Sequence, residues 1–326
     1  MLEHLRLTVP PDLVDDTLAL VIDNPCATNV VRLEGACLRP AADLVECDVT
    51  REVMSDLLDD LRHLGLSERG GIVVMTPDNT PFAEAEAIEA AAPGDPDDAV
   101  IWPEVIERAG RAGRPTVTYL LFMILAVILA GIAVITDSAI LVVGAMVVGP
   151  EFASVAAVSV GLALRRWRIA GRAGAQLLAG FAVAILVVAL LALVAVAGGL
   201  IDGNTLAQPR PQTSFIWRPD VWSFIVAVVA GTAGVLAMST DRGGAMVGVF
   251  ISVTTVPAVG NFALALALRD PAELAGSAAQ LGLNLVGMVM AGACVIALQR
   301  LLWRRVLLLS ERLVGGRAAR HDTMPA

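Results

Sequence analysis

The stretch GAMVVGPEFASV, Gly144–Val155, lies in the middle of a long apolar run. Such a run predicts a membrane-spanning helix, because about 20 apolar residues cross the hydrocarbon core of a bilayer. Gly149, Pro150 and Glu151 interrupt it, since proline removes a backbone donor and a carboxylate is costly in lipid. The sequence therefore predicts a broken helix that carries an ionisable group near the bilayer centre.

Composition separates an acidic N-terminal part from an apolar remainder. The chain has 326 residues, of which 56% are hydrophobic, and a mean hydropathy of +0.73. Residues 1–103 hold 21 acidic side chains and 6 arginines, whereas residues 104–326 hold 11 and 17. We expect an acidic soluble head joined to a mildly basic membrane body. The first 25 residues lack the apolar core of a secretory signal, so we expect the head to stay in the cytoplasm.

Several function classes lack the residues that they need. The 4 cysteines have no CxxC spacing and the 3 histidines are scattered, so we predict no metal site. The sequence has no lysine, which excludes a P-loop lysine or a Schiff base, and it shows no nucleotide-binding loop or aromatic platform. We expect no cofactor and no nucleic-acid partner. A membrane enzyme is disfavoured because the predicted spans contain no histidine.

Residues 1–77 predict an α+β domain. Leu5, Leu7 and Val9 alternate as a half-buried strand requires, and residues 50–65 form an amphipathic helix that Gly65 ends. The full order is strand, helix, strand, strand, helix, strand, the split pattern of a ferredoxin-like domain. Fold analogy favours a regulatory or subunit-pairing role. Residues 78–114 predict an acidic linker followed by a helix that approaches the membrane.

The remainder predicts a polytopic α-helical membrane protein with six transmembrane helices. The predicted spans are 117–135, 138–164, 172–198, 221–239, 243–268 and 276–300. Arginines gather before the first span and after the second and sixth, so both termini are expected in the cytoplasm. Residues 199–220 are then an extracytoplasmic loop and residues 303–326 a basic cytoplasmic tail. We expect a multi-pass protein of a bacterial cytoplasmic (inner) membrane, assembled as a homo-oligomer in the lipid bilayer.

An internal repeat appears when the membrane region is shifted by 104 residues. Thr136-Asp137 then falls on Thr240-Asp241, Leu162–Arg165 on Leu266–Arg269, and Gln176 on Gln280. Residues 115–198 and 221–302 are therefore predicted to be two copies with three helices each. An odd number of spans turns the second copy upside down, which gives the inverted repeats of many transporters.

The second copy is also interrupted, by SVTTVPAVGN at 252–261. The predicted substrate-binding or ion-binding residues are those of the two breaks: Gly149, Pro150, Glu151, Thr254, Thr255, Pro257 and Asn261. For Glu151 two interpretations stay open, a protonatable or cation-binding carboxylate, or a cap for the amides freed after the proline. The threonines and Asn261 either bind a solute or satisfy broken backbone.

Five further polar residues are predicted to serve helix packing or a cavity. Asp137 and Asp241 stand where an N-cap is expected in the interhelical turns. Gln176 and Gln280 occupy matching positions and favour hydrogen bonds between helices. Asn284, one turn beyond Gln280, is placed to join a cavity.

The segment TDSAILVVGAMVVGPEFASVAAVSVGLAL, residues 136–164, resembles the hallmark of the bacterial domain-of-unknown-function-389 family. The resemblance rests on Asp137-Ser138, the Gly-Ala-Met at 144–146 and the Gly-Pro break, and it covers about residues 115–300. Many members have a Ser-Pro-Leu-Met-Gly-Pro-like break, and Glu151 departs from that pattern. The resemblance implies no activity.

Two functions follow from the pattern. The leading hypothesis is a transporter or channel for a small solute or ion, because it accounts for the paired breaks and the carboxylate. The alternative is a membrane-anchored sensor or oligomeric scaffold whose cytoplasmic head binds a ligand or partner.

Overall fold

The computed structural model describes residues 1–96, 99–202, 205–239 and 255–321, with side chains described as far as residue 302. Contacts divide the chain into two units, Met1–Val105 with Arg300–Ala326, and Ile106–Gln299. The first holds the soluble head, and the second holds the apolar helices.

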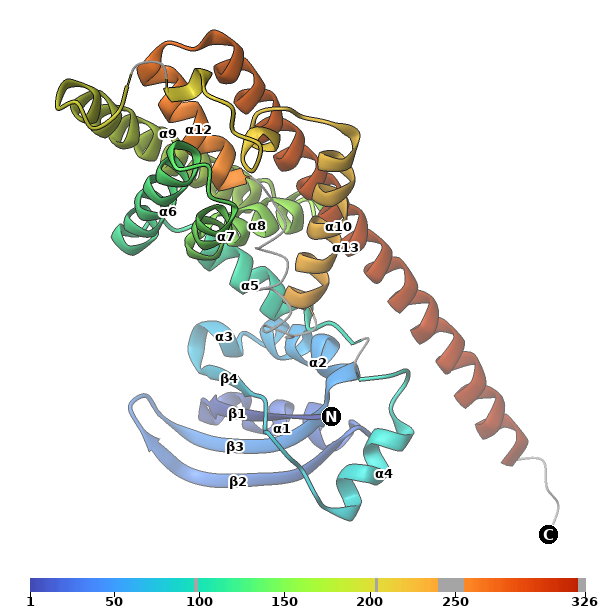
Figure 1. Ribbon diagram of the computed structural model, residues 1–326. Coiled ribbons are helices and arrows are strands. Elements are labelled where there is room, and N and C mark those ends of the chain that lie inside the picture. Colours follow the sequence, from blue (N-terminus) through green and yellow to red (C-terminus); the bar gives the residue numbers. More distant parts are fainter. Residues whose placement is uncertain (97–98, 203–204, 240–254, 322–326) are drawn as a thin grey trace. The chain divides into compact units, whose positions relative to one another are not determined.

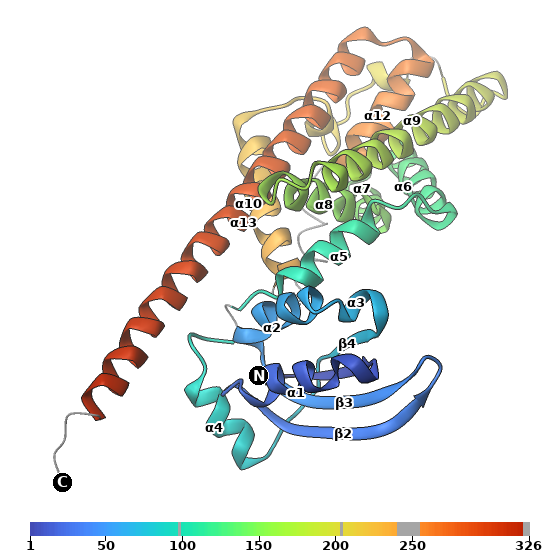
Figure 2. The same cartoon turned by 180° about the vertical axis from the view of Figure 1, so that it is seen from behind.

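The head is a four-stranded antiparallel sheet with the order β2-β3-β1-β4. Its elements are β1 (Leu2–Val9), η1 (Pro11–Leu13), α1 (Val14–Ile22), β2 (Ala27–Leu38), β3 (Ala41–Thr50), α2 (Arg51–His63), α3 (Leu66–Arg69) and β4 (Gly71–Met75). This strand order is that of a split β-α-β-β-α-β unit. Figures 1 and 2 show the sheet from opposite sides, with α1 against one face.

Alternation along the strands builds the core of the head. Leu5 and Leu7 of β1 and Val45 of β3 are fully buried, and they pack with apolar residues of α1 and α2. Helix α2 ends before Gly65, whose φ of 80° is easy only for glycine. Burial raises the pKa of the Cys47 thiol to about 12, so this thiol stays protonated and inert at neutral pH.

The linker contains α4 (Ala83–Ala91), and its end is fastened to the head before α5 (Trp102–Ala112) begins. The Arg51 guanidinium donates through Nε to the carbonyl of Ala99, 3.1 Å away, and through Nη1 to Glu3, 2.9 Å away. Ser55 donates to the carbonyl of Val100 at 3.0 Å and accepts from the amide of Trp102 at 3.1 Å. The chain therefore leaves the head for α5 from a fixed place on α2.

The apolar helices mark a membrane-embedded protein. They are α6 (Val117–Ile135), α7 (Ala139–Val148), α8 (Glu151–Ala163), α9 (Trp167–Ala197), α10 (Val221–Ser239), α12 (Thr255–Leu268) and α13 (Pro271–His321). Four of them, α6, α9, α10 and α13, are long and apolar enough to cross a membrane. A fifth span results if α7 and α8, which bend by 56° at their junction, count as one. α12 is shorter, and residues 240–254 before it, which include Asp241 and Thr254, lie outside the described residues, so six spans stay a prediction.

The bounds of the helices repeat at the offset found in the sequence. α6 and α10 begin 104 residues apart, and so do α9 and α13. Arg165 and Arg269, also 104 apart, follow α8 and α12 in the left-handed region with φ of 55° and 58°. In both places the next amide bonds the carbonyl five residues back, at 2.7 and 3.0 Å, which closes the helix end in the same way.

Two expectations about helix ends were wrong or incomplete. Asp137 is not the N-cap of α7, because it has a φ of 48° and follows the end of α6. Ser138 is the cap, and its hydroxyl accepts from the amide of Leu141 at 3.4 Å. At the C-terminus α13 continues without a break past residue 302, so the predicted tail begins as an extension of the last helix.

Candidate functional site

Glu151 and Thr255 are in direct contact. The Thr255 hydroxyl donates a hydrogen bond of 2.8 Å to Oε1 of Glu151, and both side chains are buried, at 1% and 7% exposure. Glu151 opens α8, Thr255 lies in α12, and the two are 104 residues apart. The structure therefore joins the two segments that the sequence predicts to be broken. The interruption predicted at Pro257 and Asn261 was wrong, because α12 runs continuously through both residues, and residues 240–254 lie outside the described residues.

The first break shapes the surroundings of the carboxylate. α7 ends at Val148, Gly149 is extended, and α8 begins at Glu151 after Pro150. A Cβ on Gly149 would lie 2.3 Å from Oε2 of Glu151 and 2.7 Å from a methyl group of Val256, so any larger residue there would displace one of these side chains. The carboxylate thus folds back over Gly149, between the two halves of the bent helix pair.

The carboxylate of Glu151 makes few hydrogen bonds for a buried acidic group. Oε2 has no hydrogen-bond partner in the part of the chain that the structure describes, and Thr255 supplies the bond to the other oxygen. A buried carboxylate without a cation close by is unfavourable in its charged form. Among the described residues, no cluster of three or more His, Cys, Asp or Glu forms a candidate metal site. The arrangement is suited to taking up a proton, or a cation that brings further ligands with it.

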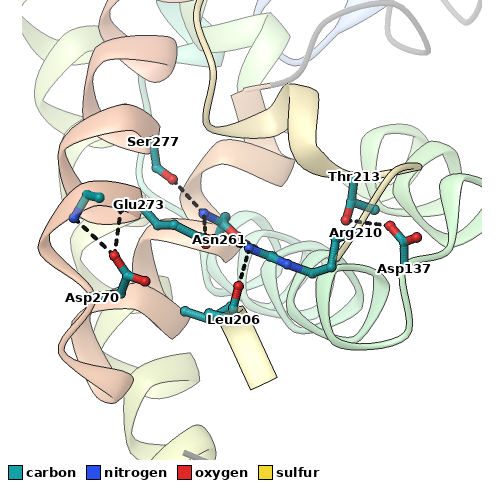
Figure 3. Close-up of polar contacts among 9 residues, drawn as sticks. Asp137, Leu206, Arg210, Thr213, Asn261, Asp270, Glu273 and Ser277 are labelled. Carbon is teal, nitrogen blue, oxygen red and sulfur yellow. Dashed lines mark hydrogen bonds and ion pairs between the residues drawn. The ribbon is translucent and has the colours of Figure 1, made fainter. Parts of the chain in front are cut away.

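A second polar cluster lies where Asn261 of α12 meets the loop 199–220 (Figure 3). Arg210 from this loop donates to Oδ1 of Asn261 at 3.2 Å, to the carbonyl of Leu206 at 3.3 Å, and to Glu273 of α13. The amide of Asn261 in turn donates to Glu273 at 3.1 Å and to Ser277 at 2.8 Å. Arg210, Asn261 and Glu273 thus form a closed ring of hydrogen bonds. We call these three residues with Ser277 the Arg210 cluster.

Local sequence explains how Glu273 is placed. Asp270 accepts from the amides of Ala272 and Glu273 at 3.0 Å each, so it caps α13, and Pro271 occupies the first helical position. Glu273 therefore lies in the first turn, where the helix dipole favours a carboxylate. Its charge is balanced by Arg210 at a site where both side chains are less than a tenth exposed.

The other predicted site residues have separate places. Pro257 is buried inside α12, one turn before Asn261. Asp137 lies near Arg210 in Figure 3, and its carboxylate accepts from the amide of Gln212 at 3.1 Å and from the Thr213 hydroxyl at 2.9 Å. The interhelical turn and the loop are therefore tied together.

Gln176 of α9 and Gln280 and Asn284 of α13 are buried polar side chains within apolar helices. Oε1 of Gln176 has no hydrogen-bond partner among the residues described. Hydrogen bonding between Gln176 and Gln280 stays a prediction.

Sequence reasoning missed Arg210 and Glu273. An arginine in a long loop normally indicates solvent, and a glutamate after Asp-Pro indicates the first turn of a helix and nothing more. The sequence signal that was present is Asn261, which is polar within a predicted span and bonds both missed residues.

Comparison with known proteins bears on this same region. Residues 146–290 match the family model described as Domain of unknown function (DUF389). This match, which covers under half of the chain, supports membership of the DUF389 family. The matched segment includes Glu151, Thr255 and the whole Arg210 cluster. No curated protein and no solved structure matches the chain.

Proposed function

We propose that the chain is a transporter or channel for a small solute or ion, with its central site at Glu151 and Thr255. The observation that carries the proposal is their buried hydrogen bond, because it places an ionisable side chain between the broken helix pair α7–α8 and α12. Broken helices near the bilayer midplane are where many secondary transporters bind their substrates. An ionisable residue inside a membrane span is most often functional.

We further propose that the two halves form an inverted repeat, each half with three spans. Support comes from the equal spacing of the starts of α6 and α10 and of α9 and α13, and from the matched helix ends at Arg165 and Arg269. Three spans per copy would reverse the second copy, so α8 and α12 would approach the membrane centre from opposite sides. The contact between Glu151 and Thr255, which occupy equivalent positions in the two copies, is compatible with this symmetry.

The chemistry of the pair favours an ion-coupled step. Glu151 can hold a proton, or share a cation with the Thr255 hydroxyl and backbone carbonyls left free at the break. A proton or cation bound at Glu151 would neutralise the carboxylate and strengthen the closed contact between α8 and α12. Loss of that proton or cation would leave a buried charge and loosen the contact. A carboxylate in this position links ion occupancy to the arrangement of α8 and α12.

The test is flux in liposomes that contain the purified full-length protein. Proton, sodium, potassium and chloride gradients and a panel of small metabolites are compared for the wild type and Glu151→Gln. Glu107→Gln is the matched control, because it makes the same chemical change at an exposed position on α5. We expect flux of at least one species, reduced about tenfold or more by Glu151→Gln alone. Wild-type flux equal to that of empty liposomes across the panel would reject the proposal.

The sensor hypothesis remains as a second candidate, since Arg51 and Ser55 hold the linker directly before α5. A ligand that moved α2 would act on the chain leading to α6. Ligand-dependent thermal shifts of the full-length protein without flux would favour this function over transport.

A further inference from the structure

The Arg210 cluster is an unusual way to hold a loop. Arg210 and Glu273 are an ion pair buried among apolar helices, and Nε of the guanidinium has no hydrogen-bond partner in the described chain. Apolar side chains of similar volume often hold such a position as well as a buried ion pair does. An ion pair differs in that its partners can exchange for water, which is what a reversible contact requires.

The loop is fastened at a second point. Asp137 holds Gln212 and Thr213, and Gln212 in turn approaches the amide of Ala139 at 3.4 Å. The segment 205–216 is therefore tied to the α6–α7 turn, to α12 and to α13. Besides these polar contacts, Leu206 and Ile216 of the segment are buried in an apolar cluster with residues of α6, α7 and α12, so the polar contacts hold the part of the segment between two apolar anchors.

α12 connects this loop to the central site. It carries Thr255, and Asn261 six residues later, which is about 9 Å along a helix. Asn261 is fully buried, and Arg210 is one of the groups that cover it. A solute that approached α12 from the side of this loop would meet Arg210 before it met the residues between Asn261 and Thr255.

We propose that Arg210 is the latch of a gate, formed by the loop segment 205–216, over the α12 end of the central site. When Arg210 binds Asn261 and Glu273 the gate is closed. When these bonds exchange for water the loop releases α12 and opens access from its side. The role assigned to the gate rests on the proposed transport function, whereas the opening of the latch can be measured without transport.

The test measures the accessibility of residue 277, which lies behind Arg210 in the cluster. Ser277→Cys is introduced into a chain whose four native cysteines are replaced, and its reaction rate with a membrane-impermeant maleimide is followed in detergent. Arg210→Ala should accelerate labelling by about tenfold or more, because the guanidinium no longer bridges Asn261 and Glu273. Arg218→Ala is the matched control, since Arg218 is an exposed arginine of the same loop.

Equal labelling rates in the two arginine variants would overturn the latch. Hydrogen exchange of segment 205–216 compares the same two arginine variants in the chain with its native cysteines. Exchange should be faster in Arg210→Ala and unchanged in Arg218→Ala. These measurements use no solute gradient, so they test the latch even if no flux is found.

Flux separates the gate from a purely structural fastening. In the same liposome assay, Glu151→Gln is expected to be inactive, whereas Arg210→Ala should raise flux above that of the wild type. Damage to folding by Arg210→Ala would instead lower the flux. If Glu151→Gln abolishes flux and Arg210→Ala leaves it unchanged or lowers it, the central site stands and the gate is rejected.

Discussion

Thr255→Val removes the hydroxyl group that bonds Glu151 while keeping the shape of the side chain. The bond is 2.8 Å long and buried, and the other oxygen of Glu151 has no partner within the described residues. After the substitution neither carboxylate oxygen retains a hydrogen bond from a side chain. The variant therefore isolates the contact between the two breaks.

The expected loss of stability follows from the number of hydrogen bonds that the carboxylate of Glu151 loses. Leaving one buried acceptor unsatisfied destabilises a protein by about 1–3 kcal/mol, and valine adds no cavity of note. Glu151→Leu with Thr255→Val removes both partners, and replacing both by apolar groups is often close to neutral. The double variant should thus be more stable than the sum of the single changes predicts, with a coupling of about 1 kcal/mol or more.

The assay is thermal unfolding of the full-length protein in detergent. A shift of about 2–4 °C accompanies each kcal/mol in domains of this size, so Thr255→Val should lower Tm by several degrees. Thr232→Val is the control, because Thr232 is a half-buried threonine within α10 whose hydroxyl makes no bond in the described residues. Equal Tm changes for the two valine variants, together with additive behaviour in the cycle, would refute a coupled contact between Glu151 and Thr255.

Three further variants test packing and the head. Gly231→Ala should destabilise the protein by about 1–3 kcal/mol, because a Cβ there would lie 2.5 Å from the backbone of α13, whereas Gly282→Ala has open space and should be tolerated in the same thermal assay. Burial raises the pKa of Glu52, so its ionisation disfavours the folded head and stability falls as pH rises through and above the ordinary carboxyl range. Glu52→Gln should reduce that fall in stability. The measurement is hydrogen exchange of the head strands at about pH 4 and about pH 8, where the variant should be better protected than the wild type at the higher pH only. Arg51→Ala leaves Glu3 buried without its cation and frees the linker, so exchange at residues 99–101 should speed up; unchanged exchange there would contradict the docking.

The sequence was most informative where a period or a repeat was present. Alternation in the head predicts the strands because Leu5 and Leu7 share one buried face. The 104-residue offset predicts corresponding places for the two polar segments, and the structure bonds Glu151 of the first to Thr255 of the second. Alternation and repetition are both visible in the sequence itself, without knowledge of how the chain packs.

The failures have a common physical cause. Asp137 looks like an N-cap in sequence, yet the left-handed end of α6 places Ser138 in that role and turns the aspartate toward the loop. Arg210 finds its partners 51 and 63 residues away, on α12 and α13, where no local signal indicates them. Contacts between distant segments depend on packing, which periodicity does not encode.

The most direct test of the central claim compares solute flux through the Glu151→Gln variant with solute flux through the wild type. It is made in liposomes with equal amounts of inserted protein, with Glu107→Gln beside it as the exposed control. The account predicts that Glu107→Gln keeps wild-type flux while Glu151→Gln loses about nine-tenths of it or more. Equal flux in all three proteins would contradict a path through Glu151.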